Sequence, residues 1–121
     1  MTYNFVTVYV KDMDKSVHFY QDVLGFSIER SFNPAPGISI TFLKDDAGHE
    51  IEFITDDSKV SYSGKGLSLG FYVKDIYETE KMLKSKNVRI ISGPVELKSG
   101  VKLLGALDIN GLELGFCQQS K

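Results

Sequence analysis

The sequence contains one pattern twice, at a constant spacing of 63 residues. The segment Tyr9–Asp12 reads Tyr-Val-Lys-Asp and returns unchanged at Tyr72–Asp75. The same spacing relates four further pairs of identical residues: Asp45 and Asp108, Gly48 and Gly111, Glu50 and Glu113, and Phe53 and Phe116. Two separated segments that share one offset are improbable by chance. We therefore interpret the 121 residues as two copies of a module of about sixty residues.

The composition excludes several classes of function. The formal net charge is −2, with two arginines and no cluster of basic residues, so nucleic-acid binding is not expected. No apolar run approaches the ~20 residues that span a bilayer, so no membrane partner is expected. The N-terminus lacks a charged segment followed by an apolar run, which predicts that there is no signal peptide. The single cysteine, Cys117, cannot form an internal disulfide and favours a cytoplasmic location.

Each module is predicted to contain a strand, a helix and three further strands. β-Branched and aromatic residues indicate the strands, and apolar residues at helical spacing indicate the helices. Asp12 and Asp75 are suited to cap the helix starts, and Gly25 and Asn87 to end the helices. The predicted strands are 4–10, 26–32, 38–43 and 49–55 in module 4–55, and 67–73, 88–91, 101–107 and 112–118 in module 67–118. Residues 33–37 are predicted as a loop and 56–66 as a linker.

Two segments resemble the vicinal oxygen chelate superfamily, which includes glyoxalase I, extradiol dioxygenases, and fosfomycin and bleomycin resistance proteins. The first is 10–26, with Phe19-Tyr20 followed by Leu24-Gly25-Phe26, and the second is 45–53. The resemblance implies an α+β fold of two βαβββ modules. Their curved mixed sheets would surround a concave cup, with the helices on the convex side. It also implies a homodimer with two equivalent sites at the subunit interface.

Alternation along the strands separates an apolar face from a mixed face. The apolar sets would face the helices and the core. They are Val6/Val8/Val10, Ile51/Phe53, Leu67/Leu69/Phe71/Val73 and Leu112/Leu114/Phe116. The opposite sets mix polar and aromatic residues, as a ligand pocket does. They are Phe5/Thr7/Tyr9, Glu50/Glu52/Ile54, Ser68/Gly70/Tyr72 and Glu113/Gly115/Cys117.

The resemblance implies four positions for a divalent metal, on the first and last strand of each module. In this chain they hold Phe5, Glu52, Ser68 and Gly115. Only Glu52 has a side chain that binds such metals well. Neither His18, on a helix, nor His49, at a turn, is placed to join it. The sequence therefore predicts no metal site, no cofactor and no catalytic residue.

The mixed faces combine carboxylates with aromatic rings, which suits a cationic or planar small-molecule ligand. The predicted ligand-binding residues are Phe5, Thr7, Tyr9, Glu50, Glu52, Ser68, Tyr72 and Glu113. A phosphonate or glutathione ligand would need Arg or Lys there, and these four faces carry none. Two alternatives stay open. Glu50 and Glu113 could be solvated rim charges, and Tyr9 and Tyr72 could pack a seam between modules or subunits.

Three functional hypotheses follow. The first is a metal-free protein that sequesters a small molecule, similar to the bleomycin resistance type. The second is an enzyme, either a glyoxalase-like lyase or isomerase or a dioxygenase, with a divalent metal held by other residues. The third is an interaction module whose cup is filled by its own side chains.

Overall fold

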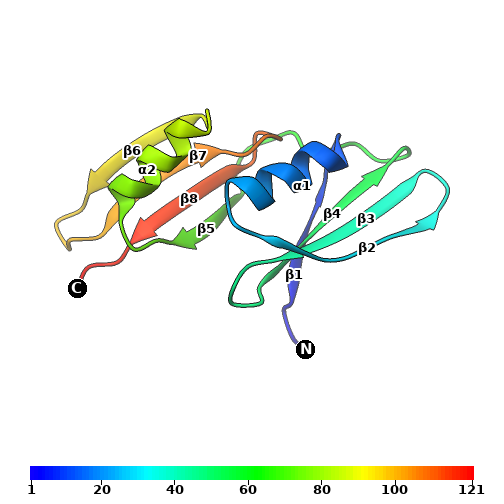
Figure 1. Ribbon diagram of the computed structural model, residues 1–121, viewed down its shortest axis with the longest axis horizontal. Coiled ribbons are helices and arrows are strands. Elements are labelled where there is room, and N and C mark those ends of the chain that lie inside the picture. The colour runs from blue at the N-terminus through cyan, green and yellow to red at the C-terminus, as the bar shows by residue number, and fades with distance from the viewer. The chain divides into compact units, whose positions relative to one another are not determined.

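Each half of the chain forms one helix and one four-stranded mixed sheet in the computed structural model, which describes residues 1–121 (Figure 1). The two units are Met1–Tyr62 and Ser63–Lys121. This confirms the predicted α+β class and the two βαβββ modules. Neither helix has the length and apolar character that crossing a membrane requires.

The first unit has its strands in the order β1-β4-β3-β2. Strand β1 pairs with β4 in parallel, and the other pairs are antiparallel. The elements are β1 (Phe5–Tyr9), α1 (Met13–Asp22), β2 (Ser27–Ala35), β3 (Ile38–Lys44) and β4 (Glu50–Asp56). Strand β2 extends to Ala35, so the loop predicted at 33–37 was mostly wrong. Asn33 explains the extension, because its Nδ2 donates to the β3 backbone at Ile38 O (3.1 Å).

The second unit repeats this arrangement, with the order β5-β8-β7-β6. Its elements are β5 (Ser68–Tyr72), α2 (Ile76–Ser85), β6 (Ile90–Glu96), β7 (Lys102–Leu107) and β8 (Glu113–Gln118). The strand predicted at 88–91 was wrong in extent, because β6 begins at Ile90 and ends at Glu96. Strand β6 continues through Gly93 and Pro94, residues that usually signal a turn, with register shifts between Ile90 and Val95. Proline is tolerated here because β6 lies at the edge of its sheet.

Aspartate side chains start both helices as predicted. Asp12 accepts from the backbone N–H of Lys15 (3.0 Å), and Asp75 accepts from those of Tyr77 (3.0 Å) and Glu78 (3.2 Å). Each bond satisfies a donor that the helix itself leaves free. Helix α2 is followed by Asn87 at a φ of +59°, a left-handed conformation that asparagine tolerates.

The repeated Asp and Gly residues form the same turn in each unit. Asp45 Oδ1 accepts from the backbone N–H groups two and four residues later, at 3.0 and 2.8 Å. Asp108 Oδ1 does the same at 2.7 and 2.9 Å. Gly48 and Gly111 complete these turns with φ of +88° and +80°, which disfavour any other residue. Both turns lead directly into the last strand of their unit, β4 or β8.

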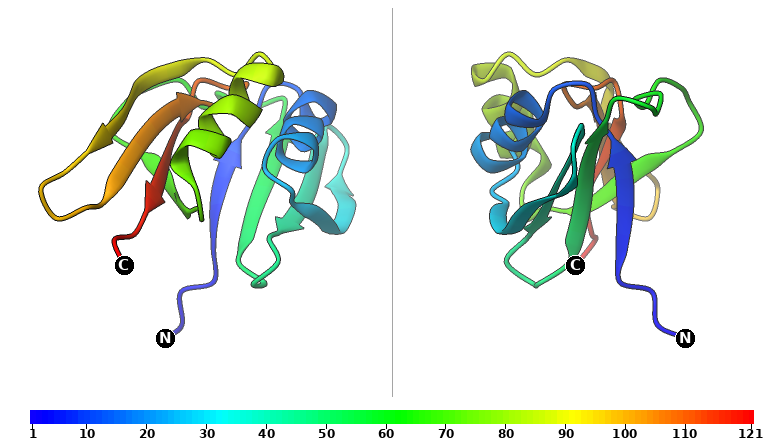
Figure 2. Two further views of the ribbon diagram at one scale, coloured as in Figure 1. Left: turned by 60° about the vertical axis from the view of Figure 1, so that its left-hand side comes forward. Right: turned by 90° about the vertical axis from the view of Figure 1, so that its right-hand side faces the viewer.

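Each helix covers one face of its own sheet (Figure 2). In the first unit, Tyr20 of α1 is fully buried and meets Phe53 of β4 edge to face, with ring centroids 4.9 Å apart. In the second, Leu83 of α2 and Leu114 of β8 are buried. The apolar face predicted for β5 is only partly covered. Helix α2 packs on β6, β7 and β8, which leaves Leu67 44% exposed.

Replacing Phe53 by alanine is expected to lower the free energy of unfolding by about 3–5 kcal/mol, because it empties a fully buried site. The matched control is Phe32→Ala, which removes the same side chain from a position that is 44% exposed. Its loss should be clearly smaller, on the order of 1 kcal/mol. Urea denaturation measures both, and equal losses would contradict this account of the core.

Candidate functional site

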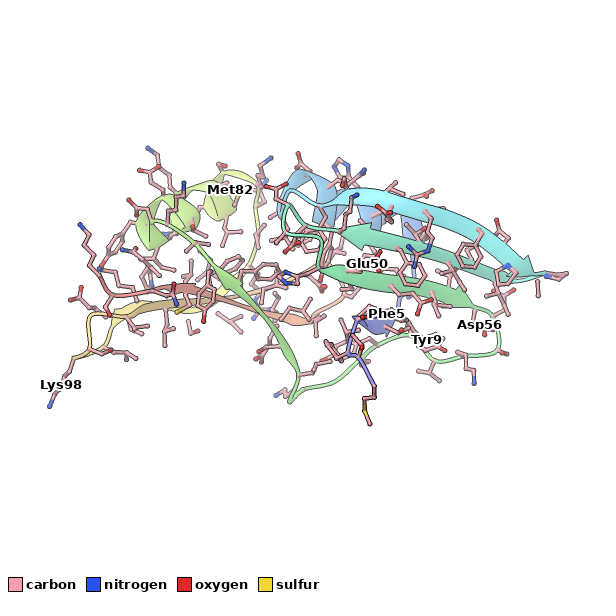
Figure 3. The ribbon with its side chains drawn as sticks, turned by 90° about the horizontal axis from the view of Figure 1, so that it is seen from below. Phe5, Tyr9, Glu50, Asp56, Met82 and Lys98 are labelled. Carbon is pink, nitrogen blue, oxygen red and sulfur yellow. The ribbon has the colours of Figure 1, made fainter.

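The face of each sheet that lies away from its helix is called here the open face. In the first unit it carries the predicted residues of β1 and β4. Phe5 lies beside Glu50, and Thr7 beside Glu52, in the parallel pairing of these strands. Figure 3 shows Phe5 and Tyr9 on β1 and Glu50 at the start of β4. The structure therefore brings all five predicted residues of the first module together on one surface.

Glu52 is held by a neighbouring hydroxyl group. Thr7 Oγ1 donates to Glu52 Oε1 at 2.5 Å, and the bond is partly buried. Thr7 is thus a positioning residue for this carboxylate. Glu52 takes part in no ion pair, so no cationic side chain of the protein lies within 4 Å of its carboxylate.

Glu50 is in a different electrostatic situation, because Arg30 of β2 reaches it. Arg30 Nη1 lies 3.2 Å from Glu50 Oε2, and the Arg30 guanidinium lies 3.8 Å from the centre of the Phe42 ring. Phe5 meets the same ring edge to face at 5.1 Å. Phe42 is therefore only 6% exposed although it lies on the open face. Glu50 and Arg30 largely cancel each other's charge.

The four mixed faces carry no arginine or lysine, but Arg30 of β2 also lies on the open face of the first unit. Those faces come only from the first and last strands of each module, whereas Arg30 comes from β2 and pairs in register with Phe42 of β3. The sequence does hold a signal for the direction of Arg30. Arg30 stands two positions before Phe32, so the two side chains would lie on the same face of a regular strand. The register shift between Ile28 and Arg30 could not be anticipated.

A second ion pair lies close to this group. Lys44 Nζ of β3 is 2.7 Å from Glu29 Oε2 of β2. The hydrogen bond from Lys44 lowers the pKa of Glu29 and raises the pKa of Lys44. Both side chains are exposed, so this pair contributes little to stability.

The open face of the second unit is hollowed. Ser68 and Glu113 lie side by side in the pairing of β5 with β8. Both line a hollow of about 440 Å³ formed by residues of this unit alone. Tyr72 is 76% exposed at the end of β5 and lines a neighbouring hollow of about 360 Å³. Cys117, which was not predicted as a site residue, lines both.

Comparison with known proteins matches residues 2–103 to the family model of the Glyoxalase/Bleomycin resistance protein/Dioxygenase superfamily. This chain belongs to that superfamily. A probable lactoylglutathione lyase from Synechocystis is 27% identical over 118 residues, which cover 92% of this chain and 90% of that protein. The resemblance inferred from 10–26 and 45–53 is confirmed.

Solved structures of the superfamily share the fold. A glyoxalase family protein from Bacillus cereus superimposes with a TM-score of 0.83 at 16% identity, covering 98% of this chain and 94% of the other. A glyoxylase/bleomycin resistance protein/dioxygenase domain from Frankia sp. gives 0.82 at 18% identity, covering 100% and 93%. At these identities the likeness establishes the fold alone.

The four positions where the superfamily resemblance implies metal ligands do not form a suitable donor set here. Phe5 and Gly115 offer no side-chain donor, and Ser68 is a poor ligand when neutral. Glu52 is the one carboxylate, and one of its oxygens already accepts from Thr7. No group of three or more His, Cys, Asp or Glu side chains is placed to hold a metal ion. The residues present therefore do not fit a divalent metal at these positions.

Proposed function

We propose that this protein binds a small molecule on its open faces and acts without a metal at the superfamily's usual positions. The proposed ligand is planar and carries a positive charge. Its proposed contacts are the predicted residues Phe5, Thr7, Tyr9, Glu50, Glu52, Ser68, Tyr72 and Glu113. On this proposal the protein sequesters its ligand and catalyses no reaction.

The proposal depends chiefly on Glu52. It is a partly buried carboxylate, fixed by Thr7 and free of any ion pair, on a surface that also carries Phe5 and Tyr9. A carboxylate in such a setting gains most from a ligand that supplies both a positive charge and hydrogen-bond donors.

The contacts of Arg30 support the proposed ligand chemistry. Its guanidinium is itself a planar cation, held between the Phe42 ring and the Glu50 carboxylate. Aromatic faces attract cations, and carboxylates accept their hydrogen bonds. The open face of the first unit thus already holds one planar cation by the contacts that we propose for the ligand.

The alternative is a metal-dependent glyoxalase-like lyase or isomerase, or a dioxygenase, with ligands at other positions. The observation in its favour is the 27% identity to a probable lactoylglutathione lyase over 92% of the chain. The two functions differ in metal content and can be separated by that property.

Protein purified without chelators is expected to contain no stoichiometric zinc, nickel, manganese or iron, because the donor set described above is incomplete. Elemental analysis by mass spectrometry measures this directly. Close to one metal ion per chain, lost in Glu52→Ala but retained in the control Glu78→Ala on α2, would overturn the proposal and favour the enzyme.

Benzamidine, benzamide and benzoate test the sign of the ligand, since they share one ring and differ in charge. Benzamidine is expected to raise the thermal unfolding temperature most, with an effect that weakens as salt screens the carboxylates. Glu52→Gln should weaken benzamidine binding by roughly 1–3 kcal/mol if a charge-assisted hydrogen bond is lost. Tyr9→Ala should weaken the binding of all aromatic ligands, whatever their charge, while the fold remains intact.

The matched control for Glu52→Gln is Glu78→Gln, which makes the same change on an exposed residue of α2. It should leave benzamidine binding unchanged. Stabilisation by benzoate alone would show that Arg30, and not Glu52, determines the sign of the ligand.

We also propose a homodimer and a cytoplasmic location. Each sheet ends in two edge strands, β1 and β2 in one unit and β5 and β6 in the other. Exposed edges are commonly covered by pairing, and two-fold dimers are the commonest small oligomers.

The proposed cytoplasmic location is supported by Cys117, the one cysteine of the chain, which is free and forms no disulfide.

Light scattering at micromolar concentration is therefore expected to give a mass near that of two chains. A dimer held through strand edges should dissociate on dilution as a single step, because both contacts of a two-fold interface are equivalent. A mass of one chain across the whole concentration range would refute this prediction.

A further inference from the structure

One row of residues crosses the open face of the first unit and is filled by large or polar side chains. In the strand pairings, Thr7 of β1 lies beside Glu52 of β4, Glu52 beside Phe42 of β3, and Phe42 beside Arg30 of β2. Thr7 and Glu52 share the hydrogen bond described above, and Arg30 contacts the Phe42 ring while it pairs with Glu50, which lies outside this row. The side chains of this row occupy the middle of that face.

The equivalent row of the second unit is almost without side chains. Gly70 of β5 lies beside Gly115 of β8, Gly115 beside Gly105 of β7, and Gly105 beside Ser92 of β6. Three glycines therefore stand abreast on three neighbouring strands. Gly105 and Gly115 line the 440 Å³ hollow, and Gly70 and Gly115 line the adjoining 360 Å³ hollow, so the two hollows meet at Gly115.

Two of these glycines are not required by the fold of the chain. Neither Gly70 nor Gly115 has a positive φ. A Cβ atom on Gly70 would meet nothing within 4 Å, and one on Gly115 would meet only the Leu69 carbonyl oxygen at 3.8 Å, an ordinary contact. Glycine inside a strand weakens it and often marks close approach of a ligand. The hollow is thus kept at a cost in stability.

Glycine at the third position has a local reason. A Cβ on Gly105 would lie 2.5 Å from Ser92 Oγ and within 3.5 Å of Ile91. Ser92 and Ile91 both line the hollow. Side chains of β6 therefore already cover the floor of the hollow at Gly105 of β7, and the open space lies over Gly115 of β8 and Gly70 of β5.

The two walls of the hollow differ in chemistry. On one side the neighbouring row contains Cys117 of β8, Leu103 of β7 and Val95 of β6, paired in that order. On the other side it contains Ser68 of β5 and Glu113 of β8. One wall is apolar, and the opposite wall offers a hydroxyl and a carboxylate.

We infer that the hollow of the second unit binds a flat aromatic ring, with an amine or N–H group on the edge that faces Glu113. The ring lies where the two hollows adjoin, on the backbone of Gly115, which lines both, and of Gly70, which lines the 360 Å³ hollow. Its apolar edge contacts Leu103 and Cys117. A volume of about 440 Å³ is within the usual range for small-molecule pockets. This inference rests on the proposed function and assigns the ring to the second unit.

The experiment measures binding of naphthylmethylamine, naphthylmethanol and naphthoate, which share one ring system and differ in charge. Gly115→Val places a branched side chain in both hollows, and Gly70→Val places one in the 360 Å³ hollow that adjoins at Gly115. We expect each to weaken binding of naphthylmethylamine and naphthylmethanol by at least about tenfold. Thermal unfolding should occur at the same or a higher temperature, because valine favours strands over glycine. Gly64→Val is the matched control, since Gly64 lies outside the strands in open space.

Glu113→Gln tests the orientation of the ligand without changing the floor. It should weaken the binding of naphthylmethylamine about tenfold and leave the binding of naphthylmethanol nearly unchanged, because only the amine carries a charge toward this wall.

Equal binding of naphthylmethylamine by wild type, Gly115→Val and Gly70→Val would overturn the inference. If Glu52→Gln still weakened benzamidine, the proposed function would stand. A wild-type protein that binds none of the naphthalenes at millimolar concentration would also overturn the inference. If the wild-type protein did not bind benzamidine, that result would count against the proposed function.

Discussion

One helix per four-stranded sheet is the constraint on which the rest of this structure depends. A helix covers only one face of a sheet, and strand geometry sends alternate side chains to the other. In the first unit, Ile51 and Phe53 of β4 are buried under α1, whereas Glu50 and Glu52, which alternate with them, lie on the open face. The core thus determines which residues remain available for recognition.

The identical residues of the two units are largely those that the fold requires. Asp12 and Asp75 cap helices, Asp45 and Asp108 hold turns, and Phe53 and Phe116 fill cores. The central rows of the open faces share no residue, with Thr, Glu, Phe and Arg in one unit and three Gly and Ser in the other. The two faces therefore cannot bind the same group in the same way. The first offers charge and aromatic contact, and the second offers space.

The sequence was a good guide wherever the interaction was local. The bond from Asp12 to Lys15 N spans three residues, and alternation within β4 needs no knowledge of its neighbours. Prediction failed where several strands had to be placed at once. Arg30 of β2 contacts Glu50 of β4 across the intervening strand β3, and its placement depends on the irregular pairing of β2. The row of Gly70, Gly115 and Gly105 likewise arises only from the registers of two strand pairs, β5 with β8 and β8 with β7.

Arg30 also bears on the enzyme alternative. A glutathione conjugate brings carboxylates, and Arg30 is the arginine on this open face that could receive one. It already pairs with Glu50 and lies against Phe42. An anion would have to displace Glu50, exchanging one carboxylate for another and leaving Glu50 without its partner, so little free energy is gained. A cation meets no such exchange at Glu52. The charge arrangement of the first unit therefore supports the proposal of a cationic ligand, even though an arginine is present.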